Sequence, residues 1–417
     1  MADANHPLQY RDFRYFWVAR LCSALAQSSM IVVIGWQVYD HARLTMSVKE
    51  ASFQLGLVGL LQFVPLFALT LVTGWTADYI DRRLVSWLCL ALQTFCAAIL
   101  AWCSVTGSIS LAPLFFVAVL LGIARAFSNP ALGALAPQLV PPHILPRAIA
   151  TNAIASRIGS ILGPALGGYL YAWAPAMPHV VSALMFGVAV FATIMIRPLA
   201  SMALDRSPNP WRQMVEGITY VRHNRLVLGA ISLDLFAVLL GGATAMLPAF
   251  AHDVLKVGPT GLGHLRAAPA VGAMATAFWF SHRPLSRRAG VRMLIAVAIF
   301  GVATIGFGVS RWMPLSLACL TILGAADMLS VYVRQSLVQL STPNEMRGRV
   351  GAVSGLFISA SNELGEAESG LLAALVGPVS AVVLGGVGAI AVTIVWARLF
   401  PALRNAEALH EIPVRKA

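Results

Sequence analysis

Ionisable side chains inside long apolar stretches are the residues of this sequence that could do chemistry. A charge near the centre of a bilayer costs about 2.5–3.5 kcal/mol or more on insertion scales, so such groups usually face a cavity or pair with one another. Five are basic and five acidic, which suits mutual pairing: Arg20, Arg125, Arg157, Arg266, Arg334, Asp234, Asp327, Glu363, Glu366 and Glu368.

The segment SNELGEAESG carries three of these carboxylates. Glu363 and Glu366 are three residues apart and share one face of a helix, whereas Glu368 lies away from Glu366. Two close carboxylates hold one proton between them near neutral pH, so Glu363 and Glu366 are candidates for a proton relay. The alternatives are pairing with Arg157 or Arg334, or exposure to a polar crevice.

Enzyme chemistry finds no support in the sequence. There is no Walker phosphate-binding loop, and the histidines and cysteines lack the spacing of metal ligands. We therefore expect no catalytic residues, no metal site and no cofactor, and any transport would draw on an ion gradient.

The elements that hold these charges are apolar helices. Apolar residues make up 58% of the chain and charged residues only 11%, against about a quarter charged in soluble domains. A spanning helix needs about 20 mostly apolar residues. The sequence predicts twelve: 15–40, 52–78, 84–106, 112–138, 147–171, 176–197, 226–250, 259–281, 291–310, 313–339, 349–375 and 378–399.

The longest polar stretch divides these spans six and six. The expected organisation is a six-helix bundle over 1–197, a cytoplasmic central loop over 198–225, a second bundle over 226–400 and a cytoplasmic tail over 401–417. Near the end of the loop, apolar residues recur at helical spacing, which predicts a short amphipathic helix on the membrane surface: Trp211, Met214, Ile218 and Val221.

The basic residues predict the orientation. With the N-terminus inside and twelve spans, about twenty Lys and Arg fall in cytoplasmic segments, and only Arg43, Lys49, Lys256 and Arg311 fall outside. The positive-inside rule then places both termini in the cytoplasm. The same placement accounts for the net charge of +12 without nucleic acid as a partner. The expected partners are a lipid bilayer and a small-molecule substrate, with the chain as a monomer.

An internal repeat supports two related halves. Residues 121–168 align with 323–370 without a gap, at an offset of 202 (323 − 121). Matching pairs are Gly122 with Gly324, Ser128 with Ser330, Arg147 with Arg349, Gly163 with Gly365 and Gly168 with Gly370. Parallel repeats of this kind are typical of six-plus-six transporters. Two aligned pairs differ in residue type: Arg125 aligns with Asp327, and Pro164 aligns with Glu366.

The segment GWTADYIDRR after the second span resembles the loop signature of the major facilitator superfamily. Gly74, Asp78, Arg82 and Arg83 match it, whereas Tyr79 and Asp81 depart from it. The resemblance implies an all-helical membrane fold of twelve spans in two pseudo-symmetric bundles. It also implies a gate, in which Asp78 caps a facing helix end and bonds arginines in one conformation only.

Residues 157–168, RIGSILGPALGG, are similar to the glycine-proline motif of drug/proton antiporters. Gly159, Gly163, Pro164, Gly167 and Gly168 match, and small residues at this spacing allow close helix packing. The alternative is that this motif serves helix packing alone. The stretch PNEMRGRV, 343–350, resembles more specifically the transmembrane secretion effectors, the branch that contains the enterobactin exporter. This branch implies export across a bacterial inner membrane.

In the resembled fold, spans one, four, seven and ten line a central cavity. Arg125 and Asp327 would then lie across it, as an alternating ion pair or a joint site for substrate and proton. The alternative is that each residue pairs permanently within its own half. A carboxylate in a dry cavity takes up a proton readily. Asp234 in span seven is a second candidate, with a local bond to a serine or the backbone as its alternative.

The function expected is proton-driven export of a small amphipathic molecule (a drug, siderophore or metabolite) by alternating access. Proton-coupled uptake on the same fold and a non-transporting scaffold or sensor remain alternatives.

Overall fold

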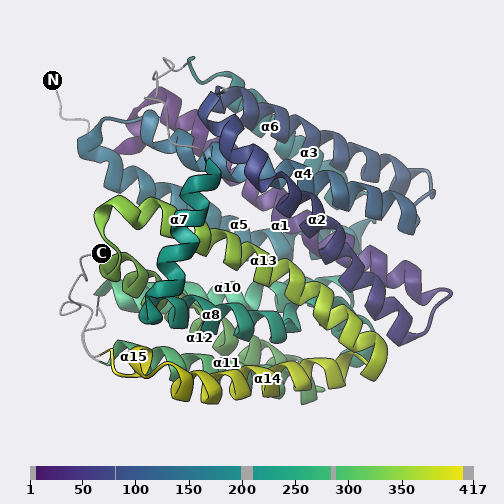
Figure 1. Cartoon of the computed structure of the whole chain (residues 1–417). Helices are drawn as coiled ribbons and strands as arrows, with labels where there is room; N and C mark the ends of the chain where they lie inside the picture. Colours follow the sequence, from purple (N-terminus) through teal and green to yellow (C-terminus); the bar gives the residue numbers. More distant parts are fainter. Residues whose placement is uncertain (1–5, 80, 199–209, 283–287, 407–417) are drawn as a thin grey trace. The chain divides into compact units, whose positions relative to one another are not determined.

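The computed structural model describes residues 6–79, 81–198, 210–282 and 288–406, without the side chains of 70–79, 129–130, 134, 210–211 and 344. All regular structure in these segments is helical. The long helices follow the twelve predicted spans closely, and their ends mostly lie within a few residues of the predicted ends (Figure 1). The all-helical fold expected from hydropathy is confirmed.

The chain divides into two compact units, which are described separately. The first comprises residues up to Thr45, Leu61–Ser207 and Val257–Ala267. It holds α1 (Arg11–Arg43), α3 (Arg82–Val105), α4 (Leu111–Leu135), α5 (Leu145–Trp173), α6 (Met177–Ile194) and the larger part of α2 (Val48–Tyr79). Helix α1 packs on α5 and α6, and α3 packs on α4 and α6.

The second unit comprises Met46–Leu60, Pro208–Lys256 and the chain from Ala268. Its helices are α7 (Pro210–His223), α8 (Arg225–Leu240), α9 (Leu247–Ala249), most of α10 (Gly258–His282), α11 (Ala289–Val309), α12 (Met313–Ser341), α13 (Asn344–Val376), α14 (Pro378–Leu399) and α15 (Pro401–Arg404). Helix α8 packs on α12, α13 and α14, and α11 packs on α12 and α14. The first turns of α2 thus belong with the second unit, and the first turns of α10 with the first.

Nine of the long helices in the described segments are apolar and long enough to cross a membrane by length and composition. Helices α5, α10 and α13 fall outside that set, and they are the helices that carry Arg157, Arg266 and the three glutamates. Their polar residues lower the hydropathy that such a test measures.

The internal repeat reappears in the helix bounds. Helix α4 begins at Leu111 and α12 at Met313, an offset of 202 (313 − 111). The aligned glycines also make equivalent contacts: a Cβ at Gly163 would lie 2.6 Å from the Cβ of Ser28 on α1, and one at Gly365 would lie 2.9 Å from the carbonyl oxygen of Val238 on α8. Helices α1 and α8 are the first spans of the two halves, so each half packs its glycine-bearing helix on its first helix.

The seventh span differs from the continuous helix predicted over 226–250. Helix α8 ends at Leu240, and a 3-10 turn, α9 and a π-helical turn (Phe250–Val254) follow. A Cβ at Gly241 would lie 2.5 Å from the ring of Phe300, and one at Gly242 would lie 2.6 Å from the carbonyl oxygen of Gly365. The two glycines permit this close approach where the helix breaks.

The helix predicted near the end of the central loop is present as α7, and its position on a membrane surface stays a prediction. Part of its apolar surface packs within the second unit, whereas Val215 is 56% exposed. Val221 is buried with Val227 and Val353, and Ile218 packs against the same cluster. The hydroxyl of Tyr220 donates to the carbonyl oxygen of Ser341 at 2.7 Å, and Arg349 Nη1 lies 2.7 Å from Glu216 Oε2. The helix is therefore attached to α8, α12 and α13.

Candidate functional site

A buried ion pair joins α8 to α12 in the second unit. Arg334 Nη1 lies 3.3 Å from Asp234 Oδ2, and the two side chains are only 3% and 6% exposed. In a low-dielectric interior either charge alone would be strongly unfavourable, so each residue accounts for the other. Asp234 was predicted as a second cavity candidate, with a bond to a local serine or backbone group as the alternative, and Arg334 was offered as a partner for the glutamates of α13. The structure instead pairs Asp234 with Arg334.

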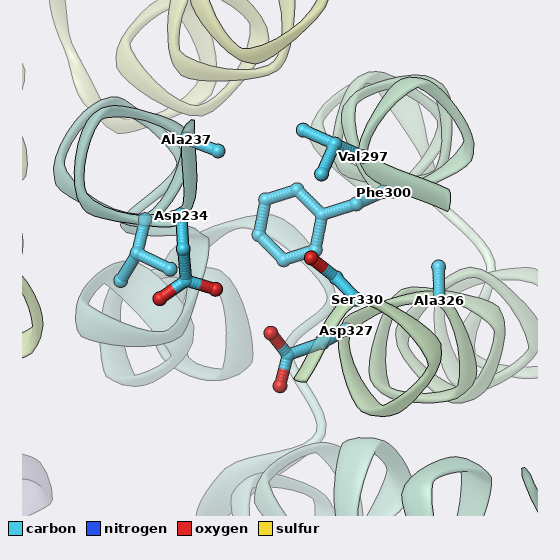
Figure 2. Close-up of a pocket in the computed structure, with 8 residues that line it drawn as sticks. Asp234, Ala237, Val297, Phe300, Ala326, Asp327 and Ser330 are labelled. Atoms are coloured by element: carbon cyan, nitrogen blue, oxygen red, sulfur yellow. The ribbon is translucent and has the colours of Figure 1, made fainter. Parts of the chain in front are cut away.

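A small pocket adjoins this pair. Asp234 and Ala237 of α8, Val297 and Phe300 of α11, and Ala326, Asp327 and Ser330 of α12 line it together with Val238. Figure 2 shows the two carboxylates entering the pocket from different helices, with the ring of Phe300 beside them. Its volume is about 10 Å³, which is about the room that one water molecule needs. An organic molecule does not fit in it.

The spacing along α12 explains the convergence. Asp327, Ser330 and Arg334 follow one another at intervals of three and four residues, which places them on one face of the helix. Within the described segments, the buried Ser330 hydroxyl and the Arg334 Nε have no hydrogen-bond partner. Buried polar atoms are normally satisfied by protein or by water, and of these two residues Ser330 lines the pocket, where one water molecule could bind its hydroxyl.

Arg125 lies in the other unit. It extends from α4, and its Nη1 donates to the side-chain oxygen of Gln62 on α2 at 3.0 Å. Arg125 and Asp327 belong to separate units, so their alternating pair stays a prediction.

The glutamates of α13 occupy different surroundings. Glu363 is buried, at 6% exposed. Glu366 lies against Gly59 of α2, where an added Cβ would be 2.8 Å from the Cβ of Glu366 and 3.3 Å from its Oε2. Ser369 donates to Glu368 Oε2 at 3.4 Å. The proton relay through Glu363 and Glu366 stays a prediction.

The gating motif is described in part. The side chains of Gly74 and Asp78 lie outside the described residues. Arg83 donates through Nε to the carbonyl oxygen of Thr193 at 3.3 Å and through Nη2 to that of Ile194 at 2.6 Å, at the carboxyl end of α6. Cations are favourable at that end of a helix. Arg82 begins α3.

Asp81, where the sequence departs from the family signature, caps the next helix. Its carboxylate accepts from the backbone N–H of Arg83 at 2.9 Å, at the start of α3. An aspartate at this position satisfies a backbone donor that the helix itself leaves open.

The packing motif of α5 meets two helices. Gly159, Gly163 and Gly167 approach α1, where a Cβ at Gly167 would lie 2.8 Å from the hydroxyl of Ser29. Pro164 and Gly168 face the first turns of α10: a Cβ at Gly263 would lie 2.7 Å from the carbonyl oxygen of Pro164, and one at Gly168 would clash with the carbonyl of Pro259. Larger residues could not occupy these glycine positions without moving a helix backbone.

Comparison with known proteins gives one family throughout. The family model of the Major Facilitator Superfamily matches residues 16–366. The Enterobactin exporter EntS of Escherichia coli (strain K12) is 25% identical over 401 residues, which cover 94% of this chain and 92% of that protein. The protein of the same name from Shigella boydii serotype 18 (strain CDC 3083-94 / BS512) is 26% identical over the same shares.

Solved structures agree on the fold. A POT family transporter in complex with 5-aminolevulinic acid has a TM-score of 0.73 at 12% identity, over 96% of this chain and 98% of that one. A D-xylose-proton symporter has a TM-score of 0.70 at 13% identity, over 93% and 98%. At such identities the likeness concerns the fold alone.

Proposed function

The chain belongs to the major facilitator superfamily and is a multi-pass membrane transporter rather than an enzyme, and from this premise we propose that it exports a small amphipathic molecule by proton antiport. The relatives named as enterobactin exporters support export and make a siderophore the first substrate to test. The proposed location is the bacterial inner membrane, with both termini in the cytoplasm and the chain acting as a monomer.

The observation that supports proton coupling is the pocket lined by Asp234, Asp327 and Ser330. Its volume suits one water or one proton carrier, and it contains two carboxylates within a bundle of apolar helices. Arg334 pairs with Asp234, and we propose Asp327, the other carboxylate that lines the pocket, as the carrier of the exchangeable proton.

In the proposed cycle, Asp327 takes up a proton when the protein is open to the outside and releases it to the cytoplasm. The carboxylate gains the proton as a neutral carboxyl and loses it again, so the net step moves one proton inward. Substrate moves outward in the alternate half of the cycle. Neutralising the pocket lowers the cost of the conformational change that carries it across the membrane.

The test is transport into inside-out membrane vesicles. Vesicles from cells that express the protein, with an acidic interior, should accumulate enterobactin or a fluorescent drug, and nigericin should abolish the accumulation by collapsing the pH gradient. Accumulation in right-side-out vesicles under an inward proton gradient would favour uptake instead. A chain that moves no solute in either orientation would be a scaffold or sensor.

Asp327→Asn is the variant that addresses the carrier. We expect it to lose transport driven by the pH gradient, because its amide cannot be ionised, while its elution profile and thermal stability stay normal. Glu345→Gln is the matched control, since Glu345 lies exposed at the start of α13. Wild-type transport by Asp327→Asn would contradict the assignment.

A further inference from the structure

A second, much larger cavity lies in the second unit, at the adjoining ends of α12 and α13. Its volume is about 520 Å³. The lining residues come from the last turns of α12 and the first turns of α13: Gln335, Val338, Gln339, Thr342, Arg347, Gly348, Gly351, Ser354, Gly355 and Ile358. Pockets for organic ligands commonly measure about 300–1,000 Å³. Size alone therefore separates this cavity from the one-water pocket beside Asp234.

The chemistry of the lining is mixed. Gln335, Gln339 and Ser354 supply uncharged hydrogen-bonding groups, and Val338 and Ile358 supply apolar surface. Arg347 is the one charged residue among the described residues that line the cavity. A lining with a single positive charge favours an anionic or neutral polar group over a cation.

The arginine is held at the rim. Arg347 Nε donates to the carbonyl oxygens of Gln339 at 3.0 Å and Thr342 at 3.2 Å, at the carboxyl end of α12. These bonds satisfy carbonyls that the helix leaves open and fix the guanidinium beside the cavity. On the same turn, Arg349 instead pairs with Glu216 of α7.

One face of α13 has glycines in place of larger side chains along this cavity. Gly348, Gly351 and Gly355 are spaced three and four residues apart, so they share a face. An added Cβ at any of them would meet no atom within 4 Å, unlike the tightly packed Gly365 and Gly370 further along the same helix. Packing against neighbouring helices thus does not explain these three glycines, whereas room for a ligand does.

We propose that this cavity binds the exported molecule, and that the molecule is an organic anion with an apolar part. The inference rests on the proposed export function and names the site and substrate class for it. The distribution of basic residues predicts that this end of α12 and α13 faces the cytoplasm, which is where an exporter collects its substrate.

Fluorescein and rhodamine 6G test the charge preference. The two dyes share a xanthene ring system, and fluorescein is anionic near pH 7.5 whereas rhodamine 6G is cationic. Fluorescence anisotropy with the purified full-length protein should show fluorescein bound at least about tenfold more tightly. Equal or tighter binding of rhodamine 6G would overturn the substrate class.

Gly351→Leu tests the location. A Cβ at Gly351 meets no atom within 4 Å, so we expect the leucine to be tolerated, to occupy part of the cavity and to weaken fluorescein binding about tenfold or more. Gly187→Leu on α6 is the matched control, because a Cβ there also meets no atom within 4 Å and no residue of α6 lines the cavity. Should Gly351→Leu fail to fold, Gly355→Leu replaces it. Unchanged fluorescein binding in the folded variant would overturn the site.

The binding and transport measurements separate the two proposals. Suppose that Gly351→Leu removes fluorescein binding while vesicles with the wild-type protein accumulate nothing under a pH gradient. The cavity would then stand as a binding site, and proton-driven export would be refuted. Gradient-driven export that continues at the wild-type rate in Gly351→Leu would retain export and refute the cavity.

Discussion

Arg334 and Asp234 show how strongly the membrane interior constrains single residues. Both side chains are almost completely buried, although Arg334 lies only seven residues before the end of α12 at Ser341. Removing one member of a buried pair leaves an uncompensated charge, at a cost of about 3–5 kcal/mol, whereas removing both is often nearly neutral.

We therefore expect strong coupling between these two residues. Asp234→Asn and Arg334→Gln should each lower the thermal unfolding midpoint of the purified protein substantially, and the double variant should recover most of the loss. Arg212→Gln is the control for an exposed pair, since the Arg212 side chain is 76% exposed beside Glu216 and such pairs contribute about 0–1 kcal/mol. Additive losses in the double variant would mean that the pair does not act as a unit.

At the scale of helices, the close approach of α2 to α13 depends on glycine. A Cβ at Gly56 would lie 2.7 Å from the Cα of Gly370, so the two backbones nearly touch. Lys49 Nζ also donates to the carbonyl oxygen of Leu375 at 2.8 Å further along the same contact. Small residues at such crossings gain van der Waals contact that larger ones prevent, and this contact drives helix association within a membrane.

Gly370→Leu should consequently destabilise the protein by about 1–3 kcal/mol or more, because the side chain must push α2 away from α13. The measurement is the unfolding midpoint in detergent, followed through tryptophan fluorescence. Gly187→Leu, in open space on α6, should shift the midpoint little. Equal shifts in the two variants would show that the α2–α13 contact yields readily.

At the scale of the whole molecule, the twelve long helices leave the orientation open, and the basic residues supply the prediction. Cysteine labelling checks it in a background whose five native cysteines are replaced. Ser108→Cys, between α3 and α4, should react with a membrane-impermeant maleimide in intact cells. His143→Cys, between α4 and α5, should react only after the cells are made permeable, and the reverse pattern would refute the predicted orientation.

The sequence determined the helices because hydropathy and glycine or proline placement act locally. Within the described segments, eleven of the twelve predicted spans coincide with continuous helices, and the offset of 202 residues anticipated that α12 begins where α4 does in the first half. For the seventh span, the paired Gly241 and Gly242 were a visible signal for the break that follows Leu240. The contact with Phe300 and Gly365 that the break permits was not visible, since it joins distant segments.

The pairing of the polar side chains is visible only in the tertiary structure. Ten charges of both signs admit many pairings, and nothing local in the sequence joins Asp234 to Arg334, which lies 100 residues further along the chain. The same holds for α7, whose Ile218 and Val221 could have met lipid or protein and in fact pack on α8 and α13. Burial of apolar surface is non-directional, so periodicity reveals an apolar face but not its partner. The same reason applies to Gly348, Gly351 and Gly355. Sequence spacing does not distinguish glycines that pack against a helix from glycines that border open space, and only the structure shows that these three border open space.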